Sequence, residues 1–163
     1  MRREELEGAL NRLAADAKKA GGWGREKWTR KTKKLLVCLG DREKYQTCAT
    51  KIEAATWSTE WLYDVVWLKA SAEFLVRDVI LVAEIEWGNE RDVWDAFQKL
   101  PLARADYRVM IFDDKPGLRG RLMKQARKFG KRGPGDRYFL ASCADGEFTV
   151  YEEVARRPEE SEA

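Results

Sequence analysis

Apolar residues recur at helical spacing in the first forty positions of the chain. The first set comprises Leu6, Leu10, Leu13 and Ala17, and the second comprises Trp28, Leu35 and Leu39. Each set lies on one face of an α-helix. The first predicts a helix over residues 3–20 that stops at a Gly-Gly pair, and the second predicts a helix over 24–39 that stops at Gly40.

The pattern then changes to runs rich in β-branched and aromatic residues, which favour strands. The most apolar run, VILVAEIEW over 79–87, predicts a central strand. An Asp-Gly pair at 145–146 predicts a tight hairpin turn. The complete set of predicted strands is 45–52, 60–68, 79–87, 107–112, 137–142 and 147–154, and the remaining predicted helices are 90–100, ended by Pro101, and 117–130.

This order, ααβββαβαββ, predicts an α/β (α+β) fold in which helices flank both faces of a central mixed sheet. We expect residues 1–20 to form an N-terminal helix, 21–155 one domain, and 156–163 a disordered tail. No apolar run approaches the length of a membrane span, so no membrane partner is expected. The three cysteines are far apart and odd in number. They fit a reducing compartment, and the chain is expected to be cytoplasmic.

Composition excludes several kinds of catalytic chemistry. The chain of 163 residues contains no histidine. That absence removes the Ser-His-Asp triad, the Cys-His pair and histidine-ligated zinc. No glycine pattern matches a nucleotide-binding loop, so no nucleotide cofactor is expected. Catalysis in this protein must use carboxylates, other polar side chains or a metal ion held by oxygen.

The net charge of +3 conceals two basic segments. Residues 18–34 carry +7 and residues 115–132 carry +8, so the rest of the chain carries −12. Such clusters favour a polyanion partner, although solvated helix faces would give the same pattern. The residues expected to contact nucleic acid are Arg30, Lys31, Lys34, Arg119, Arg121, Lys124, Arg127 and Lys128.

Three acidic residues lie within the predicted strands. Asp64 is embedded in EWLYDVVWL, and Glu84 and Glu86 project from the same face of the strand over 79–87. A carboxylate among apolar neighbours is costly unless it is paired or bound to a cation. Asp64, Glu84 and the backbone carbonyl of Ile85 would suit Mg²⁺ or Mn²⁺, hard cations that prefer oxygen ligands and promote phosphodiester hydrolysis.

This arrangement resembles the PD-(D/E)XK, or restriction-endonuclease-like, nuclease superfamily. The matching residues are Asp64 and then Glu84-Ile85-Glu86 after nineteen intervening residues. The resemblance spans about residues 28–112, with a helix before these strands and a helix and strand after them. It implies a metal-dependent endonuclease in which Asp64 and Glu84 bind Mg²⁺. It also implies a nucleic-acid substrate, DNA before RNA, and a homodimer if both strands of a duplex are cut.

The sequence departs from the family pattern at two positions. Tyr63 precedes Asp64 where the family has proline, and Glu86 replaces the catalytic lysine. Some restriction enzymes carry Glu at that position, where Glu86 would be a metal ligand or orient water. Lys99, on the following predicted helix, is a candidate for the missing basic group.

Other interpretations remain open. Asp64 could pair with Lys69 or Arg77, and Lys99 with Asp95 in an exposed i,i+4 ion pair. The protein could bind nucleic acid without catalysis, or use its basic helices to bind an acidic protein partner. Binding without catalysis predicts steeply salt-dependent association that ignores chelator.

Overall fold

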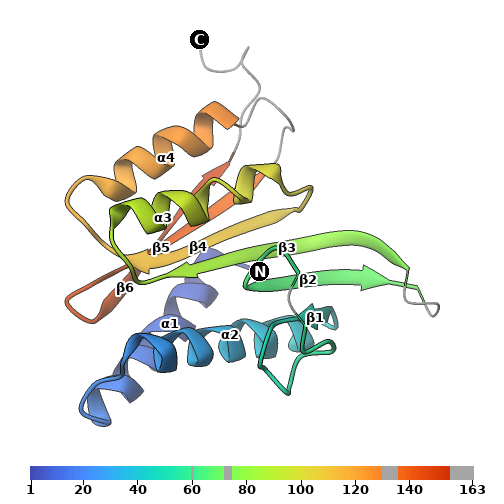
Figure 1. Cartoon of the computed structure of the whole chain (residues 1–163), viewed down its shortest axis with the longest axis horizontal. Helices are drawn as coiled ribbons and strands as arrows, with labels where there is room; N and C mark the ends of the chain where they lie inside the picture. Colours follow the sequence, from blue (N-terminus) through green and yellow to red (C-terminus); the bar gives the residue numbers. More distant parts are fainter. Residues whose placement is uncertain (60, 72–74, 130–135, 155–163) are drawn as a thin grey trace.

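The computed structural model describes residues 1–59, 61–71, 75–129 and 136–154 (Figure 1). The tail expected over 156–163 lies outside them. Within the described residues, four α-helices and one 3₁₀ helix accompany a single sheet of six strands. The helices are α1 (Arg3–Lys19), α2 (Arg25–Arg42), α3 (Glu90–Phe97), η1 (Leu100–Leu102) and α4 (Leu118–Phe129). The strands are β1 (Gln46–Cys48), β2 (Val65–Ala70), β3 (Val76–Glu86), β4 (Tyr107–Asp113), β5 (Arg137–Ala144) and β6 (Glu147–Val154).

The strands lie in the sheet in the order in which they occur in the chain. The pairs β1–β2, β2–β3 and β5–β6 are antiparallel, whereas β3–β4 and β4–β5 are parallel. Each parallel pair needs a crossover connection, and α3 and α4 supply the two crossovers. The predicted α+β class, the order of the elements and the mixed sheet are therefore confirmed.

Helices cover both faces of the sheet (Figure 1). On one face, α1 and α2 bury Leu6, Leu10 and Leu36 against side chains such as Trp67. On the opposite face, α3 and α4 form a second core around Phe97. Alternation along the strands separates the two cores, because successive side chains point to opposite faces. The sheet thus places α2 and α4 on opposite sides of the molecule.

Two predicted element ends were wrong. Gly40 does not end α2, which continues to Arg42. A Cβ at Gly40 would lie 2.7 Å from the Cγ2 of Thr47 and 2.8 Å from the Nε1 of Trp67, so this glycine permits close helix–sheet packing. The helix predicted over 90–100 is not ended by Pro101. Helix α3 already ends at Phe97, and the proline lies within η1.

The strand predictions were least accurate at the ends of the strands. The predicted strand over 45–52 is only the three-residue β1, after which the chain turns and Trp57 bridges back to Cys48. The predicted strand over 60–68 is displaced to β2, so Asp64 immediately precedes the strand. The hairpin at 145–146 was correct, since both Asp145 (φ 52°) and Gly146 (φ 80°) adopt the positive φ that a type I′ turn requires.

Helix α1 covers the outer edge of β6. The side-chain amide of Asn11 donates to the backbone oxygen of Phe148 and accepts from its N–H, both at 2.8 Å. The carboxylate of Glu7 accepts a hydrogen bond of 2.7 Å from the N–H of Val150. These side chains pair backbone groups that an edge strand otherwise leaves open to another chain. The N-terminal helix is therefore packed into the same sheet that carries the acidic residues.

Candidate acidic site at the start of β2

Asp64 is fixed to β3 by a backbone hydrogen bond. In the β2–β3 register Val65 faces Ala83, so Asp64 lies one step beyond the last paired residue. Its Oδ2 accepts a hydrogen bond of 2.9 Å from the N–H of Ile85. The carboxylate oxygen of Asp64 thus accepts a hydrogen bond from β3 just beyond the last paired residue of β2, where a backbone oxygen would otherwise serve. This contact brings Asp64 beside residues 84–86, as the spacing of the acids predicts.

Glu84 is a buried carboxylate on the face covered by α3 and α4. Its side chain is 5% exposed. One oxygen, Oε2, lies 2.9 Å from the Nζ of Lys99. The other, Oε1, is buried and has no hydrogen-bond partner among the described residues. A buried carboxylate oxygen without a partner is costly, which makes Oε1 a candidate ligand atom.

Burial dominates the ionisation of Glu84. It raises the pKa of this carboxyl group to about 7, while the hydrogen bond from Lys99 lowers it and the charge of Asp64 raises it. The charge of Lys33 also lowers this pKa. The direction of the Asp64 effect is that of a second negative charge close to Glu84. At neutral pH the protonated form of Glu84 is therefore much more favoured than it is for an exposed glutamate.

Lys99 was predicted as a candidate basic group, and the structure places its ammonium at Glu84. Lys99 lies between α3 and η1, not within the helix over 90–100 that was expected to carry it. The alternative Asp95–Lys99 ion pair was wrong, since Asp95 instead lies 3.9 Å from Arg91. The hydroxyl of Tyr63 donates to the backbone oxygen of Lys99 at 3.1 Å. Burial, aided by the charge of Glu84, raises the pKa of Tyr63.

Lys33 is a member of the site that the sequence did not single out. Its Nζ lies 2.7 Å from the Oδ1 of Asp64, and its side chain is 13% exposed. The alternatives Lys69 and Arg77 do not pair with Asp64 among the described residues. Lys33 belongs to the basic segment over 18–34, where eight basic residues look alike in sequence. Only the packing of α2 against the sheet distinguishes it.

Glu86 and Ile85 each take part in a hydrogen bond that the sequence did not predict. The Oε1 of Glu86 accepts a hydrogen bond of 2.7 Å from the N–H of Gly88, in the turn before α3. Ile85, expected to offer its carbonyl to a metal, donates its N–H to Asp64. Within the described parts of the chain, no three Asp, Glu, Cys or His side chains form a cluster that could hold a metal. Of the three acids predicted for the site, all of them described, Asp64 and Glu84 lie at neighbouring positions of the β2–β3 pair.

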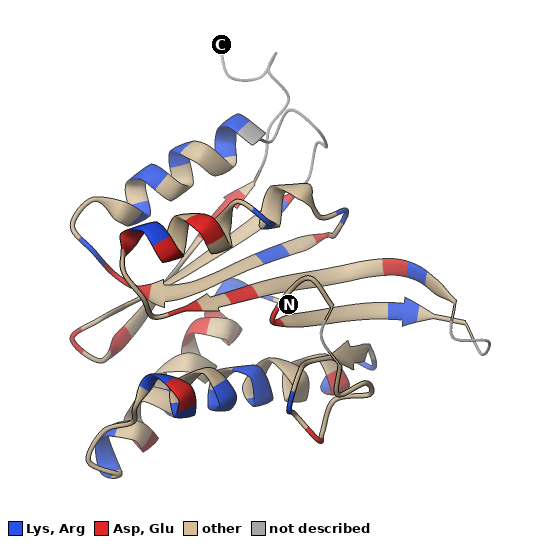
Figure 2. Cartoon of the chain, in the orientation of Figure 1, with Lys and Arg blue, Asp and Glu red and all other residues tan. Residues whose placement is uncertain are grey.

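The two basic helices lie on opposite faces of the sheet (Figure 2). On α4, three of the predicted contact residues are paired within the protein: Arg119 with Asp114, Arg121 with Glu90 and Arg127 with Glu153. Lys124 and Lys128 are exposed. On α2, Arg30, Lys31 and Lys34 form no ion pair with any described residue, and Lys31 lies over the ring of Trp23. Helix α2 also supplies Lys33, so these basic residues lie on the helix that contacts Asp64.

Comparisons with known proteins found no match to this chain. No protein-family model, no curated protein and no solved structure matches this chain. Among the described residues, no helix combines the length and apolar character that a membrane crossing requires.

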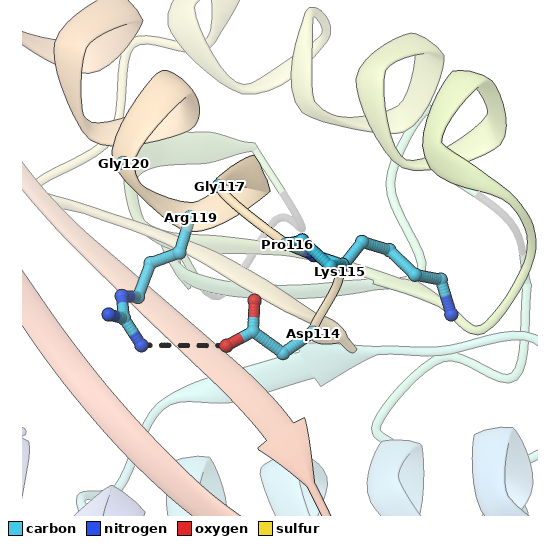
Figure 3. A pocket seen from close by; sticks show the side chains of 6 residues that line it. All are labelled: Asp114, Lys115, Pro116, Gly117, Arg119 and Gly120. Carbon is cyan, nitrogen blue, oxygen red and sulfur yellow. Dashed lines mark hydrogen bonds and ion pairs between the residues drawn. The ribbon is translucent and has the colours of Figure 1, made fainter.

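Two hollows lie away from the acid pair. The smaller, about 270 Å³, is formed where β4 leads into α4, and there Asp114 and Arg119 point toward each other while Lys115 points away (Figure 3). The larger, about 1250 Å³, lies between the outer part of β3 and the segment after η1. Arg108 lines it but is fully engaged, donating to the backbone oxygens of three residues and to Asp136. Neither hollow includes Asp64 or Glu84.

Proposed function

We propose that this protein is a metal-dependent nuclease that hydrolyses phosphodiester bonds of nucleic acid. The observation that carries the proposal is that Asp64 binds the backbone of Ile85, next to Glu84, while Lys99 binds the carboxylate of Glu84. The two carboxylates interact across the start of β2. The ammonium of Lys99 reaches the same carboxylate from a different element. Two acids and a basic group are the side chains that this chemistry requires in a protein without histidine.

The arrangement of elements supports a restriction-endonuclease-like assignment. From α2 to β4 the chain forms a helix, a three-stranded antiparallel meander, a helix and a strand parallel to the third. That order agrees with what the resemblance implies. Asp64 stands at the start of β2 and Glu84 on β3, as the motif requires. Lys99 takes the role of the motif lysine, which Glu86 has replaced.

The donor atoms suit Mg²⁺ or Mn²⁺. Both side chains offer hard oxygen atoms, and the Oε1 of Glu84 is buried without a partner among the described residues. Magnesium commonly binds one or two carboxylates and completes its shell with water and substrate phosphate. Asp64 and Glu84 would hold the ion, which would polarise the phosphoryl oxygen and activate water. We keep the carbonyl of Ile85 as a proposed third ligand.

The protein's own groups have distinct tasks in this proposal. Glu84 must lose its proton before it binds a cation, and Lys99 favours that ionised form. Glu86 is held through Oε1 by Gly88, and we assign its Oε2 to orienting water. Arg30, Lys31 and Lys34 on α2 bind phosphates beside the site. Cutting both strands of DNA would require two chains. Because α1 covers the edge of β6, the two chains would have to associate through another surface.

A cleavage assay tests the proposal. Purified protein is incubated with single-stranded and duplex DNA and RNA in Mg²⁺, Mn²⁺ or EDTA. Products that form with metal and disappear with EDTA support a nuclease. Product formation that is equal in EDTA would contradict it.

One observation favours a second candidate, a nucleic-acid-binding protein without catalysis. Both acids are already neutralised by lysines, Asp64 by Lys33 and Glu84 by Lys99. Without a metal ion, neither carboxylate is therefore left without a charged partner. This candidate predicts binding that weakens steeply with salt, ignores EDTA and yields no product. A domain that binds an acidic protein would instead fail to retain nucleic acid near physiological salt.

A further inference from the structure

Lys33 is held in position from both sides. One helical turn before it, the hydroxyl of Thr29 accepts a hydrogen bond of 3.1 Å from the indole of Trp87, at the end of β3. One turn after it, the backbone oxygen of Leu36 accepts a bond of 3.0 Å from the indole of Trp67 on β2. These bonds fasten α2 to the two strands that flank the acid pair. Lys33 therefore faces Asp64 because of how the helix is attached.

Among the described residues, each acid of the site has a lysine partner. Asp64 and Glu84 carry two negative charges when ionised, and Lys33 and Lys99 carry two positive ones. Lys33 is within electrostatic range of both acids, since its charge also lowers the pKa of Glu84. A divalent cation bound between the acids would therefore meet an ammonium already at the Oδ1 of Asp64. The two cations must compete for that oxygen.

We propose that Lys33 is a positioning residue that acts as an internal counter-ion, holding Asp64 in place without metal and lowering the affinity of the site for a divalent cation. The inference rests on the proposed metal site. Lysine suits this task because its ammonium is a compact charge on a flexible stem and can leave the oxygen without unfolding the helix. Lys99 differs in position, since its ammonium meets Glu84 and its side chain is 50% exposed.

The test is direct binding of Mn²⁺, measured by titration calorimetry in the absence of nucleic acid. Lys33→Met and Lys33→Gln both remove the charge, and the glutamine amide can still donate to Asp64 if the methionine variant does not fold. We expect either variant to bind Mn²⁺ about tenfold more tightly than the wild type. Lys33→Arg keeps a positive charge at this position, so its Mn²⁺ affinity should stay closer to that of the wild type than to that of Lys33→Met.

Two controls separate the possible failures. Lys19→Met removes the same charge from an exposed position at the end of α1, and it should leave Mn²⁺ affinity unchanged. Equal tightening by Lys19→Met, or no tightening by the Lys33 variants, would overturn the inference. Asp64→Asn should abolish binding. If Asp64→Asn binds Mn²⁺ like the wild type, or no variant binds it, the metal site itself fails and the inference fails with it.

Discussion

The Nζ of Lys99 lies 2.9 Å from the Oε2 of Glu84, although the two residues are 15 positions apart in the chain. The contact joins the segment after α3 to the C-terminal end of β3. It gives a buried carboxylate one charged partner and leaves its other oxygen unpaired among the described residues. The ionisation of Glu84 therefore depends on Lys99 more directly than on any other side chain, after the effect of burial itself.

Removal of Lys99 should move the pH dependence of the site. Lys99→Met deletes the hydrogen bond and charge that lower the pKa of Glu84, so this pKa rises above about 7. Metal binding requires the ionised carboxylate, and so the pH at which Mn²⁺ binding reaches half its maximum should rise. Lys99→Arg keeps a cation and serves as the control. An unchanged pH profile for Lys99→Met would show that Lys99 does not govern this ionisation.

The stability of the metal-free protein should fall as the pH rises, because of Glu84. Its pKa is about 7 in the folded protein against an ordinary value of 4.5, so the folded state retains a proton that the unfolded chain has released. This contribution is complete below pH 4.5 and is lost as the pH rises through 7. Each unit of difference corresponds to about 1.4 kcal/mol, which sets an upper limit of about 3 kcal/mol.

Glu84→Gln tests this directly, because the amide is neutral at every pH. In EDTA, its free energy of unfolding in urea should improve relative to the wild type between pH 5 and pH 8. The exposed Glu147→Gln provides a control with the same change of formal charge. A constant difference between Glu84→Gln and the wild type across this range would refute the assignment.

Asn11 should contribute to stability through the edge of β6. Asn11→Ala leaves the N–H and backbone oxygen of Phe148 without their present partner. We expect a loss of about 1–3 kcal/mol in the free energy of unfolding, the usual cost of unpaired polar groups at a partly buried position. Urea denaturation measures the loss, with the exposed Arg12→Ala as a neighbouring control. Equal stability of Asn11→Ala and the wild type would mean that solvent replaces the amide.

Nucleic acid should bind to α2 in preference to α4. Arg30→Ala with Lys34→Ala, and Lys124→Ala with Lys128→Ala, each remove two positive charges. The α2 pair should weaken binding of a DNA oligonucleotide by about tenfold at 0.1 M salt and reduce the salt slope by about 2. Fluorescence anisotropy across a salt series measures both quantities. A larger effect from the α4 pair would place the nucleic acid on the face away from Lys33.

The sequence predicted most of the fold because periodicity reports local structure. The helix spacing of α1 and the apolar run of β3 were sufficient to identify those elements. Element ends were less predictable, since Gly40 continues α2 for a packing reason that depends on Trp67. The start of β2 depends on which backbone groups pair with β3. At Asp64 the side-chain carboxylate, and not the backbone oxygen, accepts the hydrogen bond from Ile85.

The acidic site was predictable only in part. Adjacent strands with acids at matching positions bring Asp64 and Glu84 together, and that proximity follows from the spacing. Lys33 lies 31 positions before Asp64 on a helix with many lysines, so only tertiary packing selects it. The separation of the two basic segments onto opposite faces is likewise a property of the folded sheet.

The most direct test of the account compares cleavage by Asp64→Ala and Asp95→Ala with that of the wild type in Mg²⁺. Both variants lose one carboxylate, but Asp95 is exposed on α3 and pairs only with Arg91 among the described residues. The account predicts metal-dependent products from the wild type and Asp95→Ala, and a loss of at least about 100-fold for Asp64→Ala, with its circular dichroism spectrum unchanged. Cleavage by Asp64→Ala at the wild-type rate would contradict the central claim.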